Sequence, residues 1–218
     1  MNYEKLKEQH RARRESFSKN LDVRVHRALS WLNRSEMCGD DLDGEFIFLW
    51  ISFNSAYAYD VDEQYRKNAQ SMFDDFFGKI VELDSNNRLY QQVWSEFSSS
   101  VRVLLDNEFT FQPFWDFKFG RIPEAEWRER FEASKRKAKR GLAEQDTAAV
   151  LAVVFRRLYT LRNQMMHGAA TWNGSVNRAQ VQDSTKLLRV IQPLVIQVMM
   201  GSPSTLWGDP FYPVLERI

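Results

Sequence analysis

The sequence predicts an all-α fold, a bundle of about six or seven helices. Successive segments place apolar residues three and four positions apart, the spacing of one face of an α-helix. The apolar segments in the middle of the chain show no sustained strand alternation. With 218 residues, of which 44% are hydrophobic and 14% aromatic, the chain is large enough to build its own core.

Four apolar stripes follow one another in the N-terminal half, over residues 21–32, 46–57, 65–80 and 89–104. Residues 1–20 precede them and carry many charges, so we expect a charged helix or arm there. Asp40, Asp41 and Asp43 lie between the first two stripes and are typical helix caps. We therefore expect separate helices on either side of this loop.

Residues 107–120 form a segment dense in aromatic side chains. The segment is too aromatic for a solvated loop, and Pro113 and Gly120 break it too much for a long helix. We expect an irregular insertion that folds against the bundle. Its alternating aromatics also allow a short hairpin, which is the main alternative to a purely helical fold.

Three further elements complete the predicted fold. Pro123 is suited to the first turn of a helix that ends near Gly141. A strongly amphipathic helix leads to Gly168, and a last helix spans about 175–199. We expect residues 21–200 to form one domain, with an irregular, proline-containing tail over 201–218.

A basic cluster lies in the last turns of the helix that follows Pro123. It consists of Lys135, Arg136, Lys137, Lys139 and Arg140. One interpretation is a solvated helix end whose cations complement the helix dipole. The other is a phosphate-binding patch for RNA. The sequence leaves both open and does not place the cluster relative to the rest of the chain.

The most informative stretch begins at Arg162. This residue lies on the same apolar stripe as Leu151, so its charge needs an acidic partner, a water-filled cleft or an anionic ligand. Gly168 is typical of the residue just past a helix end, which places His167 in the last turn. Asn163 and His167 are four apart and share a helix face. The three polar side chains could converge on one phosphate.

Two stretches resemble a known superfamily. The block Leu158-Tyr159-Thr160-Leu161-Arg162-Asn163-Gln164-Met165-Met166-His167-Gly168 resembles the signature helix of HEPN domains (higher eukaryote and prokaryote nucleotide-binding domains). That signature is Arg, four to six residues and His, commonly with Asn after the Arg. Residues 46–57, with Trp50 and Phe53-Asn54-Ser55-Ala56-Tyr57, look like the aromatic early helix of the Apea-like HEPN group.

The resemblance implies a metal-independent endoribonuclease in which His167 is the acid or base, Arg162 stabilises the phosphate charge and Asn163 orients the imidazole or holds a phosphate oxygen. It also implies a homodimer through the Arg162/His167 helix, and a bacterial defence or toxin-like setting with a possible antitoxin or defence partner. HEPN toxins that are paired with nucleotidyltransferase antitoxins carry a Tyr two residues after the His as a modification site, where this chain has Ala169. A non-catalytic HEPN module that binds RNA, a nucleotide or a partner protein is the alternative.

Other classes of function find little support in the composition. With a net charge of +1, the chain has no strong overall electrostatic attraction for nucleic acid, so RNA contacts would come from local basic patches. His10, His26 and His167 are scattered and Cys38 is the single cysteine, so we expect no metal site, no cofactor and no disulfide. No membrane-spanning run or signal-peptide core is present in the sequence, and we expect a cytoplasmic protein.

Overall fold

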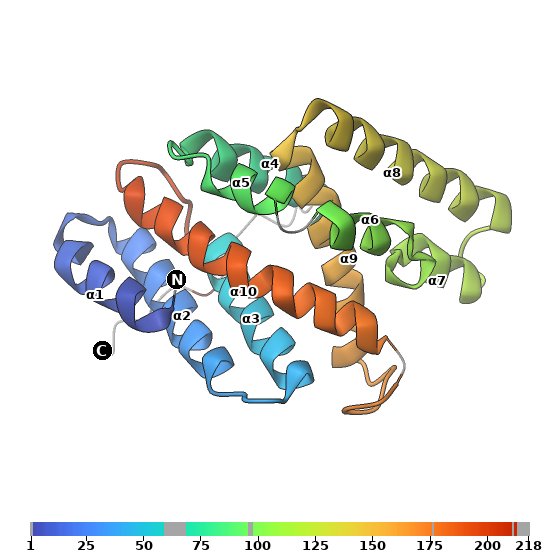
Figure 1. Ribbon diagram of the computed structural model, residues 1–218, viewed down its shortest axis with the longest axis horizontal. Coiled ribbons are helices and arrows are strands. Elements are labelled where there is room, and N and C mark those ends of the chain that lie inside the picture. The colour runs from blue at the N-terminus through green and yellow to red at the C-terminus, as the bar shows by residue number, and fades with distance from the viewer. Residues whose placement is uncertain (1, 59–68, 96–97, 176, 211, 213–218) are drawn as a thin grey trace. The chain divides into compact units, whose positions relative to one another are not determined.

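The computed structural model describes residues 2–58, 69–95, 98–175, 177–210 and 212 (Figure 1). Within these residues the chain forms ten α-helices and no strand, which confirms the all-α prediction. The helices are more numerous than the expected six or seven because the middle of the chain is built from short helices. They group into two compact units, Met1–Asn68 with Ser184–Ile218 (the first unit) and Ala69–Asp183 (the second unit).

The first unit consists of α1 (Tyr3–Arg13), the short 3-10 helix η1 (Arg14–Ser16), α2 (Lys19–Glu36), α3 (Leu42–Tyr57) and most of α10 (Arg178–Gly201). Figure 1 shows α2 and α3 side by side. Each begins where a side chain accepts a backbone hydrogen bond: Ser18 from Leu21 N at 3.3 Å, and Asp41 from Gly44 N at 3.1 Å. The expectation that the aspartate loop caps the second of these helices is therefore confirmed for Asp41.

Helix α10 packs on α3 through polar side chains as well as apolar ones. Arg189 forms a bidentate ion pair with Glu45. Gln192 Nε2 donates to Ser52 Oγ at 2.8 Å, and Ser52 Oγ donates to Ala28 O on α2 at 2.7 Å. Three helices are thus joined by one buried chain of hydrogen bonds.

The residues expected to form an arm and a tail both contribute to the core of the first unit. Leu6 and His10 on α1 are buried, as is Trp207 beyond α10. Arg24 on α2 donates to the carbonyl oxygens of Gly208 and Asp209, at 3.4 and 2.7 Å. These contacts hold the described part of the tail against α2.

The second unit consists of α4 (Ala69–Leu83), α5 (Arg88–Ser95), α6 (Ser98–Asp106), η3 (Glu108–Thr110), α7 (Gln112–Lys118), α8 (Glu124–Glu144) and α9 (Thr147–Met166). Asp84 Oδ2 accepts from Leu89 N at 2.7 Å and so starts α5 after the turn. The stripe expected over 89–104 falls on both α5 and α6, with residues 96–97 outside the described part.

The aromatic segment over 107–120 folds as η3 and α7 rather than as an irregular insertion or a hairpin. Pro113 lies at the start of α7, where its missing N–H costs nothing. Phe114 packs edge-on against Trp127 of α8, with ring centroids 5.3 Å apart. The aromatic rings pack on one another and on α8, and this packing supplies the order that the sequence pattern did not predict.

Helices α8 and α9 form an antiparallel pair joined by Gln145 and Asp146. Helix α8 runs to Glu144, one turn beyond the predicted end near Gly141. Gly141 is buried, and a Cβ there would lie 3.1 Å from Val150 Cγ2 of α9, so this glycine permits close helix packing and does not end the helix. The actual end is Gln145, which adopts the left-handed conformation at φ +54°.

Candidate functional site

The residues of the predicted site lie at the C-terminal end of α9. The helix starts at Asp146, whose side chain accepts from Ala149 N at 3.0 Å, and its apolar face is buried in the second unit. It ends in a Schellman motif: Ala169 N donates to Gln164 O at 2.8 Å and Gly168 N donates to Met165 O at 3.2 Å. Gly168 has φ +71°, so its predicted place just past the helix end is confirmed.

Arg162 and Asn163 are brought together. Arg162 is half-buried, and its Nη1 donates to Asn163 Oδ1 at 2.9 Å. Across the described residues, no carboxylate forms an ion pair with this guanidinium. Asn163 Oδ1 therefore holds the guanidinium, and the expected roles of Asn163, to orient the imidazole or to hold a phosphate oxygen, stay predictions.

His167 is the capping residue at the end of α9. Its backbone N–H donates to Asn163 O at 3.0 Å, and its side chain is exposed. The imidazole makes no hydrogen bond or ion pair with Arg162 or Asn163 in the part of the chain that the structure describes. One chain therefore presents the imidazole to solvent one helical turn from the Arg162–Asn163 pair.

Gln164 is a positioning residue that the sequence analysis did not single out. Its Nε2 donates to Phe109 O of η3 at 2.6 Å, and its Oε1 accepts from Asn177 Nδ2 at 2.9 Å. The first bond ties α9 to the aromatic segment, and the second ties it to the end of the loop that follows His167. The sequence around Gln164 does not indicate this role, because both hydrogen-bond partners lie outside α9, in η3 and in the loop before α10.

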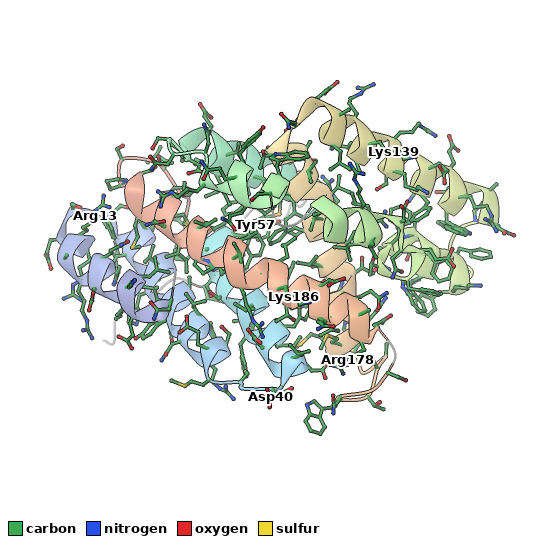
Figure 2. All side chains as sticks on the ribbon, viewed as in Figure 1. Arg13, Asp40, Tyr57, Lys139, Arg178 and Lys186 are labelled. Carbon is green, nitrogen blue, oxygen red and sulfur yellow. The ribbon has the colours of Figure 1, made fainter. Side chains whose placement is uncertain are left out.

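The basic cluster of α8 is divided between paired and free cations. Lys135 Nζ lies 3.0 Å from Asp106 Oδ1, and this hydrogen bond raises the pKa of Lys135. Lys137 Nζ lies 3.1 Å from Asp74 Oδ1. Arg136, Lys139 and Arg140 are exposed and have no ion pair within the described residues; Lys139 is labelled in Figure 2. Within the basic cluster, these three cations are the ones left available for phosphates.

The cluster does not lie beside His167. Gly141 faces Val150, and Ser134 Oγ accepts from Arg157 Nη2 at 3.3 Å, so residues 135–140 lie level with 151–156 of the antiparallel α9. From residue 157 to residue 167 the helix rises about 15 Å, at 1.5 Å per residue. The basic cluster of α8 and His167 at the end of α9 are thus at different heights along this pair of helices.

Arg157 is the core-facing arginine of α9, and the sequence analysis passed over it in favour of Arg162. Its side chain is 1% exposed, and its Nη2 also donates to Leu105 O at 3.2 Å. Its Cζ lies 4.3 Å from the ring centroid of Phe111 and 5.2 Å from that of Phe131. Arg157 is three residues beyond Val154, a spacing that places it on the apolar stripe as firmly as Arg162.

No family model, curated protein or solved structure matches this chain. Among the described residues no helix is both long and apolar enough to span a membrane. In the same part of the chain no three His, Cys, Asp or Glu side chains are grouped so that they could hold a metal ion. The acid/base and cationic groups at the end of α9 remain the best candidates for chemistry.

Proposed function

We propose that this protein is a metal-independent endoribonuclease of the HEPN type. The observation that carries the proposal is the half-buried Arg162 guanidinium, which contacts Asn163 and meets no carboxylate within the described residues. A guanidinium in such a place favours an anionic ligand, and a phosphodiester fits its planar set of donors. The exposed His167 one turn away supplies an acid/base group. The resemblance of the block around Arg162 to the HEPN signature indicates that the substrate is RNA.

The reaction follows from the two groups. The ribose 2′-oxygen attacks the adjacent phosphorus, the bond to the 5′-oxygen breaks, and a 2′,3′-cyclic phosphate and a 5′-hydroxyl are formed. His167 takes the proton of the 2′-hydroxyl or gives one to the leaving 5′-oxygen. Arg162 stabilises the charge that develops on the phosphate oxygens. Asn163 keeps the guanidinium in place through its Oδ1 and offers its amide N–H to a phosphate oxygen.

A homodimer would complete the site. Because one chain offers a single imidazole at this place, the two proton transfers need either one histidine twice or a second copy. Met166 beside His167 is 55% exposed, and such a flexible apolar side chain suits an interface between copies. We propose that two α9 ends face each other in this dimer and that Arg136, Lys139 and Arg140 add phosphate contacts away from the cleavage point.

The wider setting is proposed from the resemblance alone. It is that of a cytoplasmic bacterial defence or toxin-like effector with a defence or antitoxin partner. Ala169 replaces the tyrosine that HEPN toxins carry two residues after the histidine. Control by modification of that tyrosine is therefore not part of the proposal.

The test is incubation of the purified protein with end-labelled RNA in EDTA, followed by end-group analysis. We expect products that end in 2′,3′-cyclic phosphate. His167→Ala and Arg162→Ala should each lower the cleavage rate by at least about a hundredfold, since each removes a group that acts in the transition state. Their unfolding midpoints should stay near that of the unaltered protein.

The matched control is His26→Ala, which removes an exposed histidine from α2 in the first unit. It should cleave at the unaltered rate. A stable protein that cuts no RNA, or one whose rate survives both substitutions, would remove the catalytic proposal. Loss of folding in both variants would assign Arg162 and His167 a structural role.

A non-catalytic module that binds RNA, a nucleotide or a partner protein is the second candidate. It is favoured by the lack of contact between the imidazole and the Arg162–Asn163 pair in the described part of a single chain. In that case RNA is bound but not cut, and Arg162→Ala weakens binding much more than His167→Ala does.

A further inference from the structure

A groove runs between α6 and α8 in the second unit, with a volume of about 330 Å³. Its floor is apolar, formed by Leu105 and Ala138, and Leu142 extends the apolar surface along α8. The ion pair between Lys135 and Asp106 bridges the two helices at the groove. The volume lies at the lower end of the range of small-molecule sites.

The charges that line this groove are predominantly positive. Arg102 comes from α6 and Lys139 from α8, and both are exposed and have no ion pair within the described residues. Asp106 is the carboxylate among the lining residues, and Lys135 already neutralises it. The groove thus has two uncompensated cations, one from each wall.

A buried cation, Arg157, lies beside the groove floor. Arg157 donates through Nη2 to Leu105 O, and the Ser134 hydroxyl that it also contacts precedes Lys135 in sequence. Its Nη1 is buried without a hydrogen-bond partner. Burial lowers the pKa of Arg157 to about 10, so the guanidinium is still charged at neutral pH. The charge of Asp106 favours the charged guanidinium through space. Because no carboxylate forms an ion pair with Arg157 within the described residues, a further anion nearby would also stabilise it.

We propose that the groove between α6 and α8 binds a small amphipathic anion, an acidic head group on an apolar chain. The head group, a carboxylate or a phosphate monoester, lies between Arg102 and Lys139. The chain lies along Leu105, Ala138 and Leu142. A purely ionic ligand would leave the apolar floor uncovered, and a neutral one would leave the cations uncompensated. The proposal does not depend on RNA cleavage by Arg162 and His167.

The probes are decanoate and decyl phosphate, with decanol and inorganic phosphate as partial ligands, and binding is measured by titration calorimetry below the concentration at which micelles form. We expect one site per chain for at least one of the two anions. Decanol and inorganic phosphate should bind at least about tenfold more weakly, because each lacks half of the recognised chemistry. The tighter of the two anions identifies the head group.

Paired substitutions locate the site. Arg102→Gln with Lys139→Gln should weaken binding of the preferred anion by at least about tenfold, since both head-group contacts are lost. The control pair is Arg136→Gln with Arg140→Gln, which removes the same charge from exposed positions of α8 outside the groove. It should leave the affinity unchanged. Unfolding midpoints of both double variants establish that each is folded.

Three outcomes would overturn the proposal. The first is the absence of saturable binding by either anion. The second is an equal loss of affinity in the two double variants, which would indicate general electrostatic attraction. The third is a short oligoribonucleotide that displaces the bound anion and loses its own affinity when Arg102→Gln is made alone, which would assign the groove to RNA.

Discussion

Arg24 and Arg157 are buried and Arg162 is half-buried, and their guanidinium groups differ in what they contact. Arg24 donates to the carbonyl oxygens of Ala56, Ala58, Gly208 and Asp209, and so has a structural role. Arg157 is stacked on aromatic rings and keeps one nitrogen unpaired. Arg162 contacts its neighbour Asn163. The partners of each group, rather than burial alone, distinguish a structural arginine from one suited to a ligand.

His10 shows how burial at the residue scale affects stability. It is 1% exposed, and its Nε2 lies 2.7 Å from Asp22 Oδ1. Burial lowers the pKa of His10 and outweighs the hydrogen bond and charge of Asp22, which raise it. As the pH falls through about 6.5, the ordinary pKa of histidine, His10 therefore takes up a proton more readily in the unfolded chain than in the folded protein.

We predict that His10 makes the protein less stable as the pH falls from about 7 to 5. His10→Gln keeps a polar group near Asp22 but does not titrate, so the free energy of unfolding should fall less steeply over this range. Urea unfolding at several pH values measures the slope. A slope unchanged by His10→Gln would show that other groups cause it.

At the scale of elements, three glycines on helices or at their ends have different roles. Gly141 lies inside α8 and permits close approach to α9. Gly168 ends α9 at φ +71°, and Gly78 lies exposed inside α4; a Cβ would meet no atom within 4 Å at either position. Replacing either glycine with alanine therefore tests the backbone conformation alone, because the added methyl group meets no neighbouring atom.

We predict opposite effects of an added methyl group. Gly168→Ala should lower the free energy of unfolding by about 1 kcal/mol, because an L side chain is disfavoured in the left-handed conformation. Gly78→Ala should raise it by up to about 1 kcal/mol, because alanine favours the helix. Urea unfolding of both variants gives the two values. Equal signs would contradict the assigned roles.

At the scale of the whole molecule, the first unit is assembled from both ends of the chain and the second from its middle. Helix α10 belongs to both, since its first residues fall in the second unit and the remainder in the first. The described parts of α1 and of the tail after α10 have buried side chains. The long-range contacts of Arg24 and Glu45 thus join distant sequence segments within the first unit.

The proposed dimer gives a prediction at this scale. Met166→Glu places a charge beside His167 and should convert the dimer to a monomer and lower RNA cleavage. Met37→Glu makes the same change in the first unit, at a methionine that is 65% exposed, and should leave the dimer intact. Light scattering measures the mass of each protein. An unaltered protein that is monomeric at micromolar concentration would contradict the arrangement.

The features that depend on local interactions could be predicted from the sequence. Apolar spacing predicted the helices, one of Asp40, Asp41 and Asp43 was expected to cap α3, and Gly168 was predicted to follow the end of α9. Each of these rests on residues within one or two turns of one another, so the local pattern carries the information. The placement of His167 at a helix end followed in the same way.

The contacts between side chains of different helices could not be predicted in this way and are known from the folded structure. It paired Lys135 and Lys137 with Asp106 and Asp74, separated the basic cluster from His167, and placed Arg157 rather than Arg162 in the aromatic core. It also made Gly141 a packing residue, because Val150 of the next helix lies against it. These outcomes depend on neighbours contributed by distant segments, and the spacing of residues along one helix contains no information about them.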